Sequence, residues 1–474
     1  MIARERERTR CSWFEKLVHT LTLRAAGAVL ALGILSCTSG AAVATTVVSI
    51  DLDDGFVDDV QAASMLEARG MRATVFPISS RLGRPGYMTV DQVRSLQAAG
   101  HEIGSHTVSH ADLTKLPPDE AQREICDSRE ILLRSGFDVQ SFAYPYGALT
   151  PALERTAAAC GYNSARSVGP LSAALPAEAI PPSDPYAIRT RASIQVSNSL
   201  ADIEDGVLAA EATGGWLHLI FHRICDDACD AYSISPANFG ALLDWLASRQ
   251  PLGTVVRTQR EVIGGMSQPG VPGPPPTPRT TPNLLLNPSL EELDATGAPV
   301  CWQRLSWGSN TPTWTTVTPA YDGANAQAVE VGSYADGGVR LVPTLDLGHC
   351  APPATPGHAY QVTGFYKSSG SPVWVLLYRD DLGQWRWWTQ SAALDATSTW
   401  TQSSFTTPPL PAGASAIGFG LSLYGTGDLT VDDFTLLDAG LAPATVALTS
   451  PTNASFVRGS ATLTATAPSP SVSR

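Results

Sequence analysis

Two hydrophobic patterns alternate along the first half of the chain. Short apolar runs such as "VVSI" (47–50), "TVFPI" (74–78) and "WLHLIF" (216–221) have the length and composition of buried strands. The segments between them carry apolar residues at helical spacing and end at glycine or begin at a capping residue. This alternation predicts a parallel sheet whose strands are connected by helices.

The predicted strands are 45–52, 72–78, 101–105, 140–144, 162–168, 191–196, 216–221 and 254–257. Helices are expected near 58–69, from Thr89 to Gly100, near 118–135, after Thr150, near 200–213, after Ser235, and in a short segment after Thr258. Two of these starts, at Thr89 and Thr258, have the spacing of a capping box. Seven or eight such units favour a parallel barrel, and a doubly wound open sheet is the alternative.

The pattern changes after a proline-rich segment, 267–282, which cannot join a sheet or helix. We therefore expect a linker that leaves few contacts between the two halves of the chain. Residues 283–438 hold eight of the eleven tryptophans and short alternating runs, which are typical of an all-β sandwich. Residues 443–474 look like the opening strands of a further, incomplete immunoglobulin-like β domain.

The first 44 residues have the pattern of an export signal. Basic residues precede an apolar run at 25–35, and small residues lead to a predicted cleavage after Ala44. The apolar run is too short for a stable membrane span, so we expect a secreted protein of the bacterial cell envelope or exterior. A lipid anchor on Cys37 is the alternative, because "ILSC" (34–37) loosely resembles a lipobox.

Six of the eight cysteines follow this segment, and an even number in an exported chain favours disulfides. The expected pairs are Cys126–Cys160, Cys225–Cys229 and Cys301–Cys350. A metal site is the alternative for "CDDAC" (225–229), but that segment lacks a second cysteine pair. The formal charge of −13 argues against nucleic acid or an anionic membrane as a partner.

Polar residues follow several of the predicted strands, at the ends where parallel barrels carry their active sites. Asp53 and Asp54 come after the first strand, and His222 after "WLHLIF". "HTVSH" (106–110) places two imidazoles one helical turn apart, a spacing suited to one metal ion. Two histidines and one aspartate form a site with positions left open for water, as in catalytic metal centres. No G-x-S-x-G segment occurs, which argues against a serine hydrolase.

In this order, these motifs resemble those of the polysaccharide deacetylases, carbohydrate esterase family four, over about residues 46–266. "DLDDG" (51–55) is similar to the family's first motif, "HTVSH" to its second, "FAYPYG" (142–147) to its third and "LIFH" (219–222) to its last. The resemblance implies a distorted (β/α)7-type barrel for residues 45–266.

The resemblance also implies a role for each matching residue. Asp53 would be the catalytic base and His222 the general acid. Asp54, His106 and His110 would bind one divalent ion, with Zn²⁺ the first choice and Co²⁺ or Ni²⁺ compatible with the same ligands. Tyr146 and Tyr144 would line the substrate and oxyanion site.

Two departures from the family pattern stand out. The third motif has Ala143 where the family has an arginine, and the family's Asp-Trp fourth motif has no clear counterpart. Arg189 or Arg191 could take the place of the missing arginine in space, and both could equally be solvated strand residues.

The tryptophan-rich region resembles a jelly-roll carbohydrate-binding module. Flat indole faces stack well on sugar rings, and the candidates for such a platform are Trp374, Trp385, Trp387 and Trp388. Packing within the sandwich core is the other role open to these tryptophans.

Taken with the resemblance, the sequence predicts a secreted, metal-dependent deacetylase acting on a polysaccharide that contains N-acetylglucosamine, such as one like chitin, peptidoglycan or poly-N-acetylglucosamine. Two alternatives remain open. One is an O-acetyl esterase acting on xylan, which would use the same groups. The other is a catalytically silent carbohydrate-binding or adhesion protein, which the substitution at Ala143 permits.

Overall fold

The computed structural model describes residues 46–226, 229–441, 447–450 and 464–466. The predicted export signal and Cys37 lie outside the described residues, as does most of the predicted third β domain. Within that last segment two short strands pair, β21 (Ala447–Ser450) and β22 (Thr464–Thr466). None of the described helices has the length and apolarity needed to cross a membrane.

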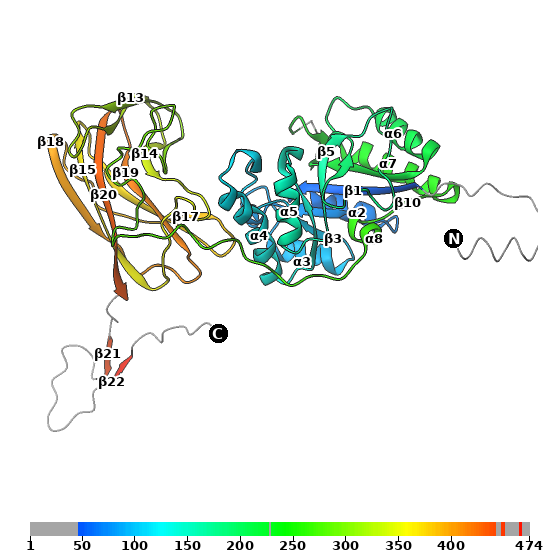
Figure 1. Ribbon diagram of the computed structural model, residues 1–474, viewed down its shortest axis with the longest axis horizontal. Helices are drawn as coiled ribbons and strands as arrows, with labels where there is room; N and C mark the ends of the chain where they lie inside the picture. The colour runs from blue at the N-terminus through cyan, green and yellow to red at the C-terminus, as the bar shows by residue number, and fades with distance from the viewer. Residues whose placement is uncertain (1–45, 227–228, 442–446, 451–463, 467–474) are drawn as a thin grey trace, which may run out of the picture. The chain divides into compact units, whose positions relative to one another are not determined.

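The first half of the chain forms one curled, eight-stranded parallel sheet surrounded by helices (Figure 1). The strand order is β10-β1-β2-β3-β4-β5-β6, and β7 pairs with the other edge of β1. This arrangement confirms the distorted barrel expected for this half. Its strands are β1 (Thr46–Asp54), β2 (Thr74–Pro77), β3 (Glu102–Ser105), β4 (Val139–Ala143), β5 (Ser164–Pro170), β6 (Ile188–Thr190), β7 (Gly215–Phe221) and β10 (Thr254–Val256).

The helices begin where the sequence places their caps. Thr89 and Thr258 each form a complete capping box, and the Thr150 and Ser235 hydroxyls cap the helices that follow them. The helices are α2 (Asp59–Glu67), α3 (Val90–Ala98), α4 (Pro118–Arg134), α5 (Pro151–Ala159), α6 (Leu200–Thr213), α7 (Pro236–Arg249) and α8 (Gln259–Ile263).

The strand predicted at 191–196 is wrong, because the extended pairing lies earlier, in β6. Ile188 packs there with Val47 and Trp216 in a small apolar cluster, whereas Arg191 is exposed.

The second half of the chain is a sandwich of two antiparallel five-stranded sheets, which confirms the all-β expectation. One sheet has the order β11-β14-β19-β16-β17 and the other β12-β13-β20-β15-β18. The strands are β11 (Trp302–Trp307), β12 (Asn310–Val317), β13 (Ala326–Tyr334), β14 (Gly338–Pro343), β15 (His358–Ser368), β16 (Val373–Arg379), β17 (Trp385–Gln390), β18 (Thr397–Thr406), β19 (Ala416–Leu423) and β20 (Gly427–Leu441).

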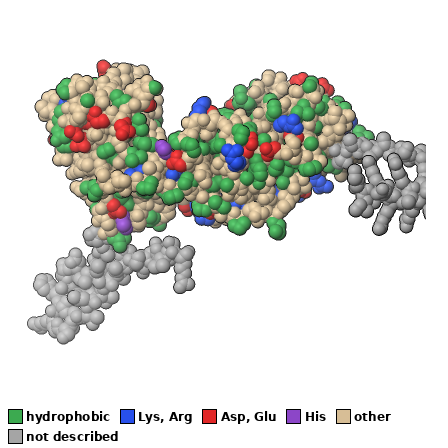
Figure 2. Space-filling model, viewed as in Figure 1, with side chains coloured by type: hydrophobic (Ala, Val, Ile, Leu, Met, Phe, Trp, Pro, Cys, Tyr) green, Lys and Arg blue, Asp and Glu red, His purple; other side chains and the backbone are tan. Residues whose placement is uncertain are grey.

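The three expected disulfides are confirmed. Cys126 of α4 is joined to Cys160 at the end of α5, Cys225 to Cys229, and Cys301 to Cys350. Charged side chains of both signs are scattered over the described residues on the face that Figure 2 shows, without an extended basic area.

The proline-rich segment, residues 267–282, forms hydrogen bonds with helix α4. Two arginines of α4 donate to its carbonyl oxygens: Arg123 to Pro274 and Pro275, at 3.0 and 2.7 Å, and Arg129 to Gln268, at 2.7 Å. Both arginines are buried, so the carbonyl groups of this extended chain satisfy guanidinium donors that water cannot reach.

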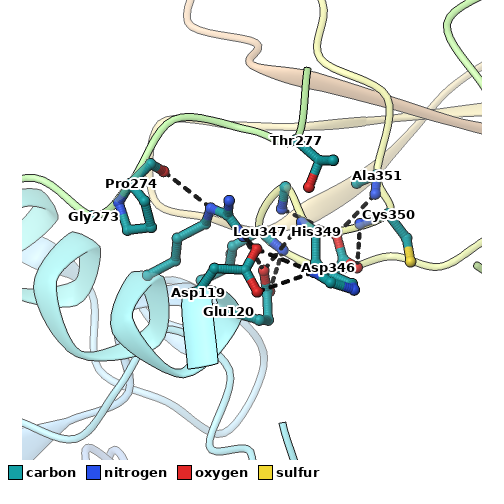
Figure 3. A network of polar contacts seen from close by, with 12 residues as sticks. Asp119, Glu120, Gly273, Pro274, Thr277, Asp346, Leu347, His349, Cys350 and Ala351 are labelled. Carbon is teal, nitrogen blue, oxygen red and sulfur yellow. Dashed lines mark hydrogen bonds and ion pairs between the residues drawn. The ribbon is translucent and has the colours of Figure 1, made fainter. Parts of the chain in front are cut away.

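Figure 3 shows the start of α4 meeting the loop that follows β14. The Glu120 carboxylate accepts backbone N–H groups of Leu347 and His349, and the His349 ring lies 3.0 Å from the Asp119 carboxylate. Within that loop Asp346 accepts from Cys350 and Ala351 at 2.8 Å each. Carboxylates at the first turn of a helix are favourably placed, and these two also bind a second segment.

Candidate active site

Asp54, His106 and His110 come together at one end of the parallel sheet. Asp54 is the last residue of β1, and the two histidines belong to the loop that follows β3. The Asp54 Oδ1 atom lies 3.3 Å from Nε2 of His110 and 3.8 Å from Nε2 of His106. One candidate ligand atom from each of the three residues fits within a 4.8 Å span. The structure therefore brings together the three predicted metal ligands.

The two histidines are not one helical turn apart, as their spacing suggested, because residues 106–110 form a loop. Thr107 and His110 have φ angles of +67° and +68°, which fold the segment back on itself. The Thr107 hydroxyl donates a hydrogen bond to the His106 carbonyl oxygen and accepts one from the His110 N–H at 2.9 Å. Left-handed conformations are costly outside glycine and gather at functional sites. Asp54 and Tyr146 also have positive φ, so four of the eight such residues in the described chain lie here.

A buried carboxylate on α4 supports this loop from behind. Glu124 accepts the backbone N–H groups of Val108 and Ser109 at 2.9 Å each, and the Ser109 hydroxyl as well. Burial raises the pKa of Glu124 to about 7, despite these hydrogen bonds.

The chemistry of the three residues fits a divalent metal ion. The Nδ1 atom of His106 is 2.8 Å from the Ala143 carbonyl oxygen, so Nδ1 carries the proton and Nε2 is free to bind a metal. Burial lowers the pKa of His106, and that of His110 to about 3, so both rings are neutral. Asp54 Oδ1 is buried without a hydrogen-bond partner in the described structure, which is the state expected of an atom reserved for a ligand.

Asp53 points into the same region and is 1% exposed. Burial opposes its ionisation, but attraction to Arg166 lowers the pKa of Asp53. His222 follows β7 directly, and its Nδ1 is buried without a partner among the described residues. An ionised carboxylate and a histidine thus flank the three metal-ligand candidates.

A match with a known family agrees with this geometry. The polysaccharide deacetylase profile matches residues 41–165. YxkH of Bacillus subtilis, a polysaccharide deacetylase by its name, is 34% identical over 119 residues, which are 24% of this chain and 42% of that protein. Residues 41–165 belong to the polysaccharide deacetylase family.

A second curated relative and one solved structure are also similar to parts of this chain. The peptidoglycan-N-acetylglucosamine deacetylase of Bacillus cereus is 27% identical over 120 residues, 25% of this chain and 54% of that protein. The chain thus spans about half the length, or less, of these two curated relatives. A solved xylan-binding domain from Paenibacillus barcinonensis aligns with 32% of this chain and 93% of its own, with 19% identity and a TM-score of 0.24.

The third sequence motif, residues 142–147, contributes one tyrosine to the site, not two. Tyr146 has a φ of +60° and is 66% exposed, and its hydroxyl is 3.2 Å from Nδ1 of His110. Gly147 allows this turn to lie against β5, because a Cβ at that position would come within 2.5 Å of the Val168 nitrogen. The prediction that Tyr144 contacts the substrate is wrong, because Tyr144 is fully buried in the core and its hydroxyl donates to the Tyr186 carbonyl.

The arginine of the site comes from neither position that the sequence suggested. Arg191 is exposed and lines a separate surface cavity with Asn198 and Asp202, and Arg189 pairs with Glu178 at 2.6 Å. The guanidinium beside Asp53 belongs instead to Arg166 of β5, which is fully buried and forms an ion pair with that carboxylate. No motif marks "SARSV" (164–168); only the alignment of β5 with its neighbours could have identified this residue.

Behind Arg166 lies a buried chain of charged and polar groups. Asp51 of β1 lies 2.7 Å from Arg166 Nε and 2.8 Å from His218 Nδ1, and all three residues are fully buried. The Arg166 guanidinium also lies 4.6 Å from the Phe76 ring centre. Asp51 is therefore not a solvated neighbour of Asp53, and its contacts fix the arginine on which Asp53 depends.

The proposed tryptophan platform is not supported as a whole. Trp374 is fully buried in the sandwich core, and its indole N–H donates to Ser403, so it offers no face to a ligand. Trp388 packs partly against the same core, and Trp385 donates to the Leu345 carbonyl at 2.9 Å. Trp387, 61% exposed, is the member of this group with a free face.

Proposed function

We propose that the protein is a metal-dependent deacetylase that hydrolyses N-acetyl groups of a polysaccharide containing N-acetylglucosamine. The observation that carries this proposal is the convergence of Asp53, Asp54, His106, His110 and His222 at one end of the parallel sheet. Such a set combines a metal site with a base and an acid, the groups that amide hydrolysis requires.

Asp54, His106 and His110 would hold the ion, with Zn²⁺ the first choice and Co²⁺ or Ni²⁺ compatible with the same ligands. A divalent ion bound there would act as a Lewis acid on the acetyl carbonyl and lower the pKa of water.

The chain's own residues handle the protons. The Asp53 carboxylate takes a proton from the attacking water, because Arg166 holds it ionised and buried beside the site. The Tyr146 backbone N–H would stabilise the negative charge that develops on the carbonyl oxygen. His222 gives a proton to the leaving nitrogen as the C–N bond breaks, which yields acetate and a free amine on the sugar.

The buried position of Arg166 bears on the silent-protein alternative. That alternative rested on Ala143, and Arg166 now supplies a guanidinium at the catalytic carboxylate.

We also propose that the protein is exported through residues 1–44. The three disulfides support this, because such bonds persist in oxidising compartments. The sandwich would then bind the polysaccharide.

Acetate release tests the proposed reaction. Full-length protein loaded with Zn²⁺ should release acetate from N-acetylated chito-oligosaccharides and leave acetylated xylan intact. Release from xylan alone would favour the esterase, and release from neither, with metal bound, would contradict the enzyme proposal. The Asp53→Asn variant is the matched control, since it retains every metal ligand.

A further inference from the structure

One sheet of the sandwich has an outer face whose side chains the proposed reaction does not use. Along β15 the side chains alternate: Val362 and Tyr366 are buried in the core, whereas Phe365 and Lys367 lie half-buried on the opposite face. On the neighbouring strand β18, Phe405 packs toward the core, so Trp400 falls on the same outer face as Lys367.

An aromatic side chain from a loop is fixed on this face. Tyr321, between β12 and β13, stacks on Phe365 with ring centres 3.4 Å apart and planes at 13°. Its ring centre is 6.1 Å from that of Trp400, in an edge-to-face arrangement, and the residue is 45% exposed. Asp432 of β20 anchors the loop, accepting the N–H groups of Tyr321 and Asp322 at 2.8 and 3.0 Å. Because Phe365 holds one face of Tyr321, the exposed part of this ring is rigidly presented.

A polar cavity is lined by Lys367, which contacts Trp400. Lys367 places its ammonium 4.5 Å from the Trp400 ring centre and lines a cavity of about 480 Å³. The rest of the lining is rich in hydroxyl groups and includes one carboxylate: Ser368, Ser369, Thr397, Ser398, Asp428 and Thr430. Small groups of this kind donate and accept hydrogen bonds in the way that sugar hydroxyls require.

We infer that Tyr321 and this cavity are the glycan-binding site of the sandwich, and that the ligand is a neutral, hydroxyl-rich sugar chain. One pyranose ring stacks on the exposed face of Tyr321. The neighbouring sugar units of the same chain form hydrogen bonds with Lys367, Thr430 and Asp428. The inference rests on the part of the proposed function that assigns polysaccharide binding to the sandwich. It does not depend on the deacetylase chemistry. It replaces the predicted tryptophan platform, of which only Trp387 keeps a largely exposed ring.

Binding of the full-length protein to insoluble chitin and to insoluble xylan tests the inference, measured as depletion from solution. Tyr321→Ala should weaken binding about fivefold to tenfold, the usual worth of one aromatic stack. Tyr321→Phe should bind as wild type does, because the ring remains. Trp387→Ala is the matched control, since it removes a more exposed ring from the other sheet and should leave binding unchanged.

Further variants keep the test decisive. Lys367→Met removes the ammonium of the cavity but keeps the aliphatic stem, and should weaken binding even if Tyr321→Ala fails to fold. Asp53→Asn should bind as wild type does, which separates loss of binding from loss of the proposed reaction. Unchanged binding by both Tyr321→Ala and Lys367→Met would overturn the inference. So would a loss confined to Trp387→Ala, or wild-type protein that binds neither polymer.

Discussion

Ala143 and Arg166 lie directly opposite each other on the adjacent parallel strands β4 and β5. The third motif, on β4, therefore has alanine at position 143, and the adjacent strand β5 supplies an arginine, Arg166, directly beside it. Arg166 is fully buried, and its guanidinium reaches both Asp53 and Asp51. Its position explains how the Asp53 carboxylate, the proposed base, can be held in place although the motif itself contains alanine.

This relationship predicts a rescue. Arg166→Ala should lower kcat for acetate release by about 10- to 100-fold with little change in KM, since it removes the group that orients the proposed base. The double variant Arg166→Ala, Ala143→Arg should recover part of that loss, because the guanidinium would start from the adjacent strand. Melting temperatures check folding, since the single variant removes the ion-pair partner of buried Asp53 and leaves buried Asp51 with His218 alone. A single variant that lost its metal, with no recovery in the double variant, would contradict a positioning role.

Substitutions of the two adjacent aspartates, Asp53 and Asp54, should have different effects on metal content. Asp54→Asn should lose metal and activity together, because it removes a ligand whose Oδ1 has no other partner in the described structure. Asp53→Asn should keep about one metal equivalent per chain while acetate release falls by about 10²–10⁴-fold, the range expected for a positioned proton transfer. Elemental analysis beside the activity assay distinguishes the two. Full activity in Asp53→Asn would rule out the proposed mechanism.

Much of the fold could be predicted from local patterns, because capping boxes and buried strands are properties of a few adjacent residues. Thr89 and Thr258 are examples, as is the strand that leads into Asp53 and Asp54. Asp53 and Asp54 share one motif and His106 and His110 another, and the structure places these predicted residues together. Tyr144 and Tyr146 also share a motif, but only Tyr146 lies at the site. The predictions that were wrong concern properties that depend on segments distant in the sequence. Arg166 is identified only by the alignment of β5 with β4, and the burial of Trp374 is decided by the opposing sheet.

Glu124 predicts a dependence of stability on pH. Its folded-state pKa of about 7 lies above the ordinary 4.5, so the folded protein binds this proton more tightly than the unfolded chain. The resulting stability is present below about pH 4.5 and is lost as pH rises through 7, in total on the order of 3 kcal/mol. Urea unfolding at several pH values between 4.5 and 8 should show this decline in wild-type protein, and a flatter profile in Glu124→Gln. Parallel profiles would show that Glu124 does not titrate in this range.

Buried arginines of α4 predict where the first half of the chain can be cut. A fragment ending at residue 266 removes the Gln268 and Pro269 carbonyls from Arg129, and the Pro274 and Pro275 carbonyls from Arg123. Each buried donor left without a partner costs about 1–3 kcal/mol, and more when it is charged. The fragment 46–266 should therefore unfold at a lower urea concentration than 46–282, which retains all four carbonyls. Arg123→Met, Arg129→Met in both fragments is the matched control, since without the guanidinium groups the extra sixteen residues should confer little stability. Equal midpoints for the two unmodified fragments would show that the proline-rich segment is the passive linker its composition suggests.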